Sequence, residues 1–278
     1  MLFRARQFEF IFPRPAIVMG IVNVTPDSFS DGGKFFDSGK AISRALKLID
    51  EGAEILDIGG ESTRPNSKPV SEKEELRRVI PVIEKLAGKI KIPISIDTMK
   101  PAVARAALKS GASIVNDVAA NRDDGEMREI VSEFRAGYVC MRAPRALHKI
   151  EKQKNIVADV EIFFREHLQK LKAIGIAPEQ IIFDPGIGFG KTLEQNLRLL
   201  AHLKNFVKLK RPLLLGVSRK SFIEKLFGAN VNERLPASLA CAILGVESGA
   251  QIIRAHDVAE TIQAVRMAEA VLARNNAI

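Results

Sequence analysis

The sequence has only two cysteines, one tyrosine and no tryptophan, and these shortages exclude several classes of protein. Cys140 and Cys241 stand in apolar runs without a CxxC motif or a neighbouring histidine, which argues against a disulfide framework and a cysteine-bound metal. No Lys/Arg run is interleaved with aromatic residues, so a nucleic-acid partner is disfavoured. No stretch approaches the ~20 uncharged apolar residues of a membrane-spanning helix, so we expect no membrane partner.

Charged residues interrupt the apolar amino terminus at Arg4, Arg6, Glu9 and Arg14, which leaves no apolar core for a secretion signal. We therefore expect a cytoplasmic protein. The formal net charge is +9, and the excess lies in the second half: residues 1–139 hold 21 basic and 20 acidic residues, residues 140–278 hold 21 and 13. An anionic small substrate explains such an excess as well as nucleic acid does.

Eight short apolar runs, many of them rich in β-branched residues, alternate with helix-length segments. This repetition is typical of parallel strands joined by helical crossovers, and the length suits one (β/α)8 barrel of ~250 residues. We predict an α/β fold, a single-domain (β/α)8 TIM barrel over residues 1–278 with its core at about 15–274. The runs are residues 17–22, 54–58, 92–96, 112–115, 138–141, 180–183, 213–217 and 251–253.

Apolar residues at helical spacing predict the intervening helices. Gly52 and Gly88 stand where two of these helices should end, and Ser71 with Glu74 predicts a capping box at the start of one. The connections after the first and second strands, residues 25–37 and 60–70, are long and suggest substrate loops. The predicted helices span residues 38–51, 71–88, 102–108, 160–171, 193–203, 235–246 and 258–272.

Polar residues end most of the predicted strands, and in a barrel of this type strand ends converge on one mouth. Ionised Asp97 and Asp184 only accept hydrogen bonds, whereas Asn116 both donates and accepts, a set suited to a flat heterocycle with an amidine-like edge. A helix N-cap is the alternative role for Asp184. Asp57 lies deeper, where a structural hydrogen bond is favoured over catalysis.

Basic groups gather after the last two predicted strands, the usual phosphate region of such barrels. Residues 218–221 read Ser-Arg-Lys-Ser, and Arg254 precedes His256 by two residues, which together favour a polyanion. The glycine-rich stretch 184–192 matches neither a P-loop nor a dinucleotide fingerprint. The amide oxygen of Asn23 is a candidate Mg²⁺ ligand, with Asp27 and Asp31 as alternatives.

Seven ordered motifs between Ile17 and Leu272 closely resemble the dihydropteroate synthase family: MGIVNVTPDSFSDGG, GGESTRP, SIDTMKP, IVNDV, DPGIGFGKT, GVSRKSF and RAHDV. The resemblance implies a transferase of folate biosynthesis and a homodimer. Its reaction joins 6-hydroxymethyl-7,8-dihydropterin diphosphate to 4-aminobenzoate, giving 7,8-dihydropteroate and diphosphate.

The resemblance also implies roles for individual residues. Asp97, Asn116, Asp184 and Lys220 would hold the pterin, with Met141 as an apolar wall. Asn23, Arg254 and His256 would hold the diphosphate with Mg²⁺, and Lys220, Asp97, Arg254 and His256 would be catalytic. The remaining substrate contacts would come from Thr63, Arg64, Pro65, Phe189, Gly216, Ser218, Arg219 and Ser221.

One stretch departs from the family pattern. The family commonly has a His-Met-x-Gly-x-Pro-like sequence after the fifth strand, whereas this chain reads Cys-Met-Arg-Ala-Pro at 140–144, followed by a basic tract to residue 156. This departure leaves a non-catalytic pterin-binding paralogue as an alternative. A pterin-dependent corrinoid methyltransferase is a second one, although that enzyme would not need Arg254 and His256 at a diphosphate.

Overall fold

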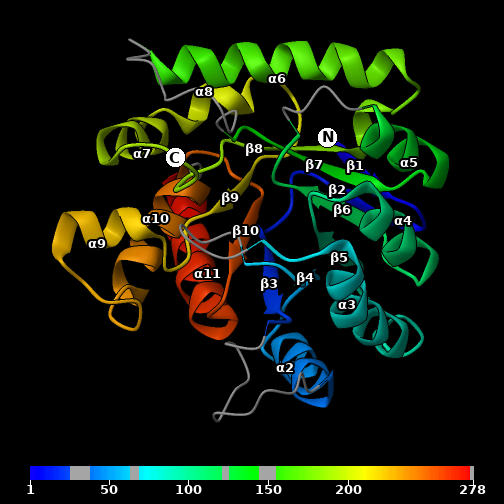
Figure 1. Cartoon of the computed structure of the whole chain (residues 1–278). Coiled ribbons are helices and arrows are strands. Elements are labelled where there is room, and N and C mark those ends of the chain that lie inside the picture. Colours follow the sequence, from blue (N-terminus) through cyan, green and yellow to red (C-terminus); the bar gives the residue numbers. More distant parts are fainter. Residues whose placement is uncertain (26–37, 63–68, 121–124, 144–154, 276–278) are drawn as a thin grey trace.

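Eight parallel strands form a ring in the computed structural model, which describes residues 1–25, 38–62, 69–120, 125–143 and 155–275 (Figure 1). Neighbouring strands pair in the order β8-β7-β6-β5-β4-β3-β10-β9. The ring closes between β8 and β9, where the Phe183 N–H donates to Pro212 O at 2.9 Å and Phe183 bridges to Leu213. The predicted barrel is confirmed. Its strands are β3 (Ile17–Asn23), β4 (Ile55–Gly59), β5 (Ile94–Asp97), β6 (Ile114–Asp117), β7 (Gly137–Met141), β8 (Ile181–Asp184), β9 (Leu214–Gly216) and β10 (Ile252–Ala255).

Helices surround the ring of strands (Figure 1). The seven predicted helices are present, but the one predicted at 193–203 is two, because His202 adopts a non-helical conformation between them. Two short helices, at 126–134 and 221–227, are not among those seven. The helices are α2 (Ser38–Asp50), α3 (Glu72–Ala87), α4 (Pro101–Lys109), α5 (Glu126–Phe134), α6 (Ile156–Ala173), α7 (Leu193–Ala201), α8 (Leu203–Val207), α9 (Ser221–Phe227), α10 (Leu235–Glu247) and α11 (Val258–Asn275), with a 3₁₀ turn η1 (Pro178–Gln180) before β8.

The start of α3 shows half of the predicted capping box. Ser71 Oγ accepts from the Glu74 N–H at 3.3 Å, as expected of an N-cap. The Glu74 carboxylate, however, accepts from Arg77 and Arg78 on the same helix instead of turning back to Ser71. Two guanidinium groups within reach offer charge-assisted hydrogen bonds, which are stronger than one to a neutral backbone N–H.

An amino-terminal hairpin, β1 (Leu2–Ala5) with β2 (Phe8–Ile11), closes the lower end of the barrel. Its Phe3 is fully buried, stacks on Phe10 and packs in one cluster with residues from the starts of the barrel strands. A Cβ on Gly137 would lie 2.7 Å from the Phe3 ring, so glycine is needed there for the hairpin to approach β7. No element is predicted for this segment from the sequence.

The inward-facing positions of the strands change from apolar at the lower end of the barrel, where the strands begin, to polar at the upper end, where they finish. Successive residues of a strand point to opposite sides, so inward positions are two residues apart. Ile55, Ile114, Ile182, Leu214 and Ile252 belong to the lower cluster. Two residues further on, the same strands carry Asp57, Asn116, Asp184, Gly216 and Arg254. The strand ends predicted to meet at the mouth therefore lie on the inner face.

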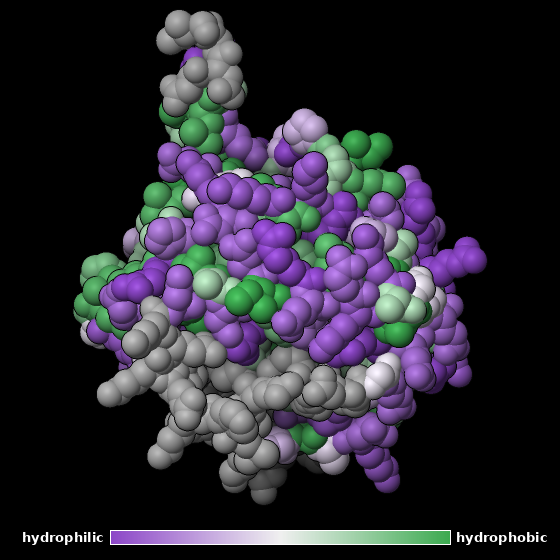
Figure 2. All heavy atoms as spheres, turned by 90° about the horizontal axis from the view of Figure 1, so that it is seen from above, coloured by the Kyte–Doolittle hydropathy of each residue, from purple (hydrophilic) through white to green (hydrophobic). Residues whose placement is uncertain are grey.

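The outer surface carries hydrophilic side chains with small, scattered apolar groups on the face shown in Figure 2. Exposed Ile162 and Ile174 on and beside α6 are single apolar residues of this kind. Among the helices that the structure describes, none combines the length and the apolar character of a membrane span.

Candidate active site

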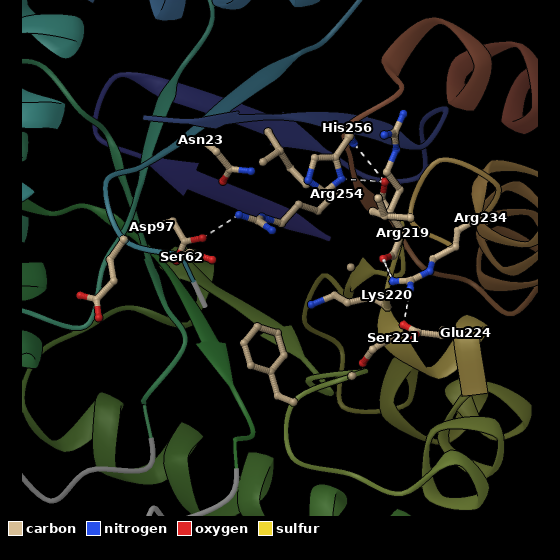
Figure 3. A pocket seen from close by; sticks show the side chains of 17 residues that line it. Asn23, Ser62, Asp97, Arg219, Lys220, Ser221, Glu224, Arg234, Arg254 and His256 are labelled. Carbon is tan, nitrogen blue, oxygen red and sulfur yellow. Dashed lines mark hydrogen bonds and ion pairs between the residues drawn. The ribbon is translucent and has the colours of Figure 1, made fainter. Parts of the chain in front are cut away.

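A cavity of about 360 Å³ opens at the carboxyl ends of the strands (Figure 3). The structure brings ten of the predicted site residues together around it. Three more, Asn116, Met141 and Asp184, are buried at adjoining strand ends and do not line it. Predicted residues Thr63, Arg64 and Pro65 lie outside the described residues, as do Asp27, Asp31 and most of the basic tract. The ten are Asn23, Asp97, Phe189, Gly216, Ser218, Arg219, Lys220, Ser221, Arg254 and His256.

A carboxylate–guanidinium network crosses the barrel at this level. Arg254 Nε donates to Asp57 Oδ2 at 2.6 Å, and Arg254 Nη2 donates to Asp97 Oδ2 at 2.6 Å. Asn116 Nδ2 donates to the same Asp57 oxygen at 3.0 Å. Strand pairing explains the assembly, since Asp97 is in register with both Asn116 on β6 and Gly59 on β4. Side chains from four strands thus form one connected polar group.

Three buried oxygens of this network have no hydrogen-bond partner among the described residues: Oδ1 of Asp57, of Asp97 and of Asn116. Buried polar atoms are rarely left unpaired, and each exception requires an explanation such as a bound ligand. All three atoms are hydrogen-bond acceptors. Two are carboxylate oxygens, and the third is the Asn116 amide oxygen, because the amide nitrogen is the group that donates to Asp57. A ligand that satisfies the Asp97 and Asn116 oxygens must therefore present donors.

The electrostatic setting of Asp97 is unusual for a carboxylate. Burial raises the pKa of Asp97 to about 7, although the adjacent Arg254 guanidinium opposes the rise, and the nearby Asp57 charge adds to it. Burial disfavours the charged form of an acid, and a like charge has the same effect. The pKa of Asp97 is therefore shifted upward, toward the range where a change of charge alters binding.

Asp184 lies at the end of β8, where the glycine-rich stretch 184–192 begins. Its Oδ1 accepts from the Gly186 N–H at 2.7 Å, and its Oδ2 has no described partner. Burial raises the pKa of Asp184 above its usual range, against the effects of that hydrogen bond and of Lys220. The predicted helix-cap alternative is not seen, because Thr192 caps α7. One carboxylate oxygen thus fixes the loop, and the other has no hydrogen bond to a described residue.

Lys191, which is not among the predicted site residues, fastens this loop to the end of β7. Its ammonium donates to Gly186 O at 2.7 Å and to Arg142 O at 2.9 Å, and burial lowers its pKa to about 7. Gly186 has φ +68°, and a Cβ there would lie 2.3 Å from Arg142 O. The two loops therefore touch at a position that only glycine permits.

Lys220 reaches the cavity from the segment that follows β9 (Figure 3). Its ammonium lies 4.0 Å from the centre of the Phe189 ring, a cation–π contact. Burial, together with the Arg254 charge, lowers the pKa of Lys220 to about 8, while Asp184 and Asp97 oppose this shift. Lys220 is therefore a hydrogen-bond donor held between carboxylates on one side and an aromatic ring on the other.

An apolar wall stands beside these polar groups. Met141 is buried in a small cluster with Val118 and Ala143, against which Met99 and Phe189 pack. Arg142 follows Met141, and its guanidinium pairs with Asp159 at 2.9 Å and lies over the Phe163 ring. In residues 140–143, the described part of the stretch that departs from the family pattern, Met141 thus belongs to the apolar wall and the Arg142 charge points toward α6.

The anion-binding candidates lie at the other side of the cavity. His256 Nδ1 is 2.9 Å from Ser218 Oγ, and the same hydroxyl accepts from the His256 N–H at 3.1 Å. Arg254 presents Nη1, which has no acceptor among the described residues, and Asn23 faces the same space (Figure 3). Imidazole, guanidinium and amide groups thus line the same cavity, a set of side chains suited to an anion.

Arg219 forms a fork with Asp257 rather than extending across the cavity. Its Nε and Nη2 donate to the two Asp257 oxygens at 2.9 and 2.5 Å, with the backbone in a left-handed conformation (φ +56°). Arg234 donates to Arg219 O at 3.1 Å and pairs with Glu224. Arg234 and Glu224 line the cavity but were not predicted, because neither lies at a strand end.

The fold and these groups define a class of protein: a (β/α)8-barrel enzyme that binds a flat, donor-bearing ring beside an anion. Comparison with known proteins then identifies the family. Residues 19–256 match the family model described as pterin binding enzyme, and the chain belongs to that family.

Several dihydropteroate synthases are similar to this chain over most of their length. The Escherichia coli enzyme is 45% identical over 92% of this chain and 91% of its own. A Xanthomonas albilineans structure with 4-aminobenzoic acid is 44% identical, with a TM-score of 0.89, and covers 95% of this chain and 96% of that one. A structure from the same organism in complex with 7,8-dihydropteroate is 41% identical, with a TM-score of 0.89, over 98% and 99%.

Proposed function

We propose that the chain condenses 6-hydroxymethyl-7,8-dihydropterin diphosphate with 4-aminobenzoate, giving 7,8-dihydropteroate and diphosphate in folate biosynthesis. The observation that carries this proposal is the juxtaposition of two unlike groups in one cup. Buried acceptor oxygens of Asp97 and Asn116 have no described partner, and Arg254 and His256 line the adjoining open cavity. Family membership and close relatives that are dihydropteroate synthases support the same reaction.

The site has an open part, the cavity, and a closed part, the buried strand ends beside it. The pterin ring fits the closed part. Its amino group and ring N–H groups are donors, which match Oδ1 of Asp97, Oδ1 of Asn116 and Oδ2 of Asp184. Lys220 supplies a donor for the ring acceptors, and the apolar wall that includes Met141 packs against one face of the ring. Charge-assisted hydrogen bonds from a planar edge give this recognition its direction.

The diphosphate fits the open part, where cations are available. Arg254 Nη1 and His256 bind its oxygens, and the Ser218 hydroxyl orients the His256 ring. Negative charge develops on the bridging oxygen as the bond to the pterin methylene breaks, and fixed cations stabilise that charge. Arg254 thus assists the departure of the leaving group.

The residues present fit the predicted Mg²⁺ in one respect. Mg²⁺ is usually held by one or two protein oxygens together with water and substrate phosphates, and Asn23, whose side chain carries an amide oxygen, lines the cavity together with Arg254 and His256. Among the described residues no cluster of three His, Cys, Asp or Glu side chains offers an alternative metal site. When bound, Mg²⁺ would neutralise charge on the diphosphate.

The order of bond changes follows from the charge of the cup. Loss of diphosphate before attack by the amine leaves a cationic pterin methylene, which ionised Asp97 stabilises. 4-Aminobenzoate then enters from the open side, past Phe189 and Ser221, with Thr63, Arg64 and Pro65 as further expected contacts. Comparable rates for amines of very different basicity are the expected result. A steep dependence on basicity would instead indicate direct displacement.

The assembly and location are proposed on other grounds. Leu244 on α10, with Met267 and Val271 on α11, are exposed apolar residues on two helices that pack together, and we propose that they contribute to a homodimer interface. Sedimentation should then give a dimer that Leu244→Glu weakens. A cytoplasmic location stays a prediction from the sequence.

Release of diphosphate in the presence of both substrates tests the reaction. Turnover that requires 4-aminobenzoate is the expected result, and Lys220→Ala should abolish it without lowering the thermal midpoint. Pterin binding without turnover in the unaltered protein would indicate the non-catalytic paralogue. Pterin-dependent methyl transfer without diphosphate release would indicate the corrinoid enzyme.

A further inference from the structure

Asp57 is the one carboxylate of the network that does not line the cavity, and its environment is the most closed. The residue is fully buried, and a single oxygen, Oδ2, accepts from both Arg254 and Asn116. Its other oxygen, Oδ1, is buried without a described partner, so the contacts that the structure shows link Asp57 to the site through these two side chains. The role inferred for Asp57 rests on the proposed function, since Arg254 and Asn116 both belong to the proposed site.

The Arg254 guanidinium is divided between two carboxylates. Its Nε and Nη2 form one edge, the fork that normally binds both oxygens of a single carboxylate. Here Nε donates to Asp57 and Nη2 donates to Asp97, so Asp97 uses only Oδ2. Asp97 Oδ1 consequently remains buried and unpaired. Without Asp57, the fork is expected to close on Asp97 and occupy both of its oxygens.

The same Asp57 oxygen also fixes the direction of the Asn116 amide. An amide presents either its NH₂ group or its oxygen toward a given partner, and a rotation of the side chain exchanges them. Because Asp57 accepts from Nδ2 at 3.0 Å, Asn116 Oδ1 faces away from Asp57 as an acceptor. That oxygen is the second unpaired acceptor of the ring site.

We propose that Asp57 is a positioning residue: by holding one arm of Arg254 and the amide of Asn116, it keeps one oxygen each of Asp97 and Asn116 available to the pterin. From its place in the sequence, Asp57 is expected to have a structural hydrogen-bonding role. The geometry points to a role in substrate recognition, exerted through residues on two other strands.

Asp57→Asn tests this role with four measurements, because a neutral amide oxygen holds the Arg254 guanidinium more weakly than a carboxylate does and leaves the fork to close on Asp97. Bare 6-hydroxymethyl-7,8-dihydropterin should bind about 10-fold or more weakly by calorimetry, because two ring acceptors are compromised and each hydrogen bond contributes a factor of about 2 to 10. Inorganic diphosphate should bind as well as before or more tightly, since a negative charge beside Arg254 is lost. The rate constant kcat should fall, and the thermal midpoint should not.

Ser95→Ala is the matched control, because Ser95 pairs in register with Asp57, is fully buried and has an unpaired hydroxyl. It should leave both affinities and kcat within twofold and the thermal midpoint unchanged. Arg254→Lys supplies a second background, in which no fork can close on Asp97, and there Asp57→Asn should weaken bare pterin less.

Three results would overturn the proposal. Pterin affinity within twofold of the unaltered protein would remove the role, and a parallel loss of pterin and diphosphate affinity with a lowered midpoint would make Asp57 structural. An undiminished effect in the Arg254→Lys background would exclude the route through Arg254. Each result leaves turnover of the unaltered protein intact, so failure of this inference is distinct from failure of the proposed reaction.

Discussion

Replacement of Asp184 by asparagine separates recognition from stability. The carboxylate uses Oδ1 to accept from the Gly186 N–H at 2.7 Å, and asparagine can keep that bond with its own oxygen. Its NH₂ group then replaces Oδ2, so a donor meets a donor of the pterin edge. The loop conformation should survive, whereas the ligand loses an acceptor.

The size of the effect follows from the kind of bond that is lost. A hydrogen bond to a charged group contributes about 1.5–3 kcal/mol, and about 1.4 kcal/mol corresponds to a factor of ten in affinity. Asp184→Asn should therefore weaken bare pterin by about 10- to 100-fold in calorimetry. Burial raises the pKa of Asp184, so its ionised form is disfavoured in the folded protein, and removing the charge should not lower the thermal midpoint.

Two results would refute this reasoning. An affinity within twofold of the unaltered protein would mean that Oδ2 does not contact the pterin. A midpoint several degrees lower, with the loss of affinity in proportion to the unfolded fraction, would mean that Asp184 acts through the loop alone. Asp117→Asn is a useful comparison, because Asp117 is also a buried carboxylate near the barrel top but accepts from the Tyr138 hydroxyl at 2.8 Å.

Three further predictions concern charge, pH and packing. Arg254→Ala should weaken the pterin diphosphate about 10- to 100-fold and bare pterin far less, as measured by calorimetry, and equal losses would remove its role as an anion ligand. The pH profile of kcat/KM should be a narrow bell: activity falls below about 7 as Asp97 becomes protonated and above about 8 as Lys220 loses its proton. A flat profile from pH 6 to 9 would contradict it. Phe3→Ala should lower the free energy of unfolding by about 3–5 kcal/mol in denaturant titration, whereas Phe227→Ala, at an exposed residue, should change it little. Equal effects of the two substitutions would contradict the conclusion that the hairpin closes the lower end of the barrel.

Periodicity was sufficient to predict the barrel because each strand is short, apolar and buried on both sides. The amino-terminal hairpin was missed for the opposite reason. Its strands have only four residues each. Arg4 and Glu9 alternate with Phe3, Phe8 and Phe10, and in the sequence these charges served only to argue against a secretion signal. Its burial depends on contacts with the starts of distant strands, which no local pattern contains.

The site was predictable in its members and not in its connections. Strand ends indicated Asp97, Asn116 and Arg254, because parallel strands bring such residues to one mouth. The division of Arg254 between Asp57 and Asp97 depends on side-chain directions across the barrel, which the linear sequence does not specify. Lys191 was missed because its partners are backbone carbonyl groups of two loops.

The most direct test of the central claim is a crystal structure of the protein with 6-hydroxymethyl-7,8-dihydropterin diphosphate. The account predicts the ring edge within hydrogen-bond distance of Asp184 Oδ2 and of the unpaired oxygens of Asp97 and Asn116, with the diphosphate against Arg254 and His256. A ring bound away from these oxygens, or a diphosphate on another side of the molecule, would contradict it.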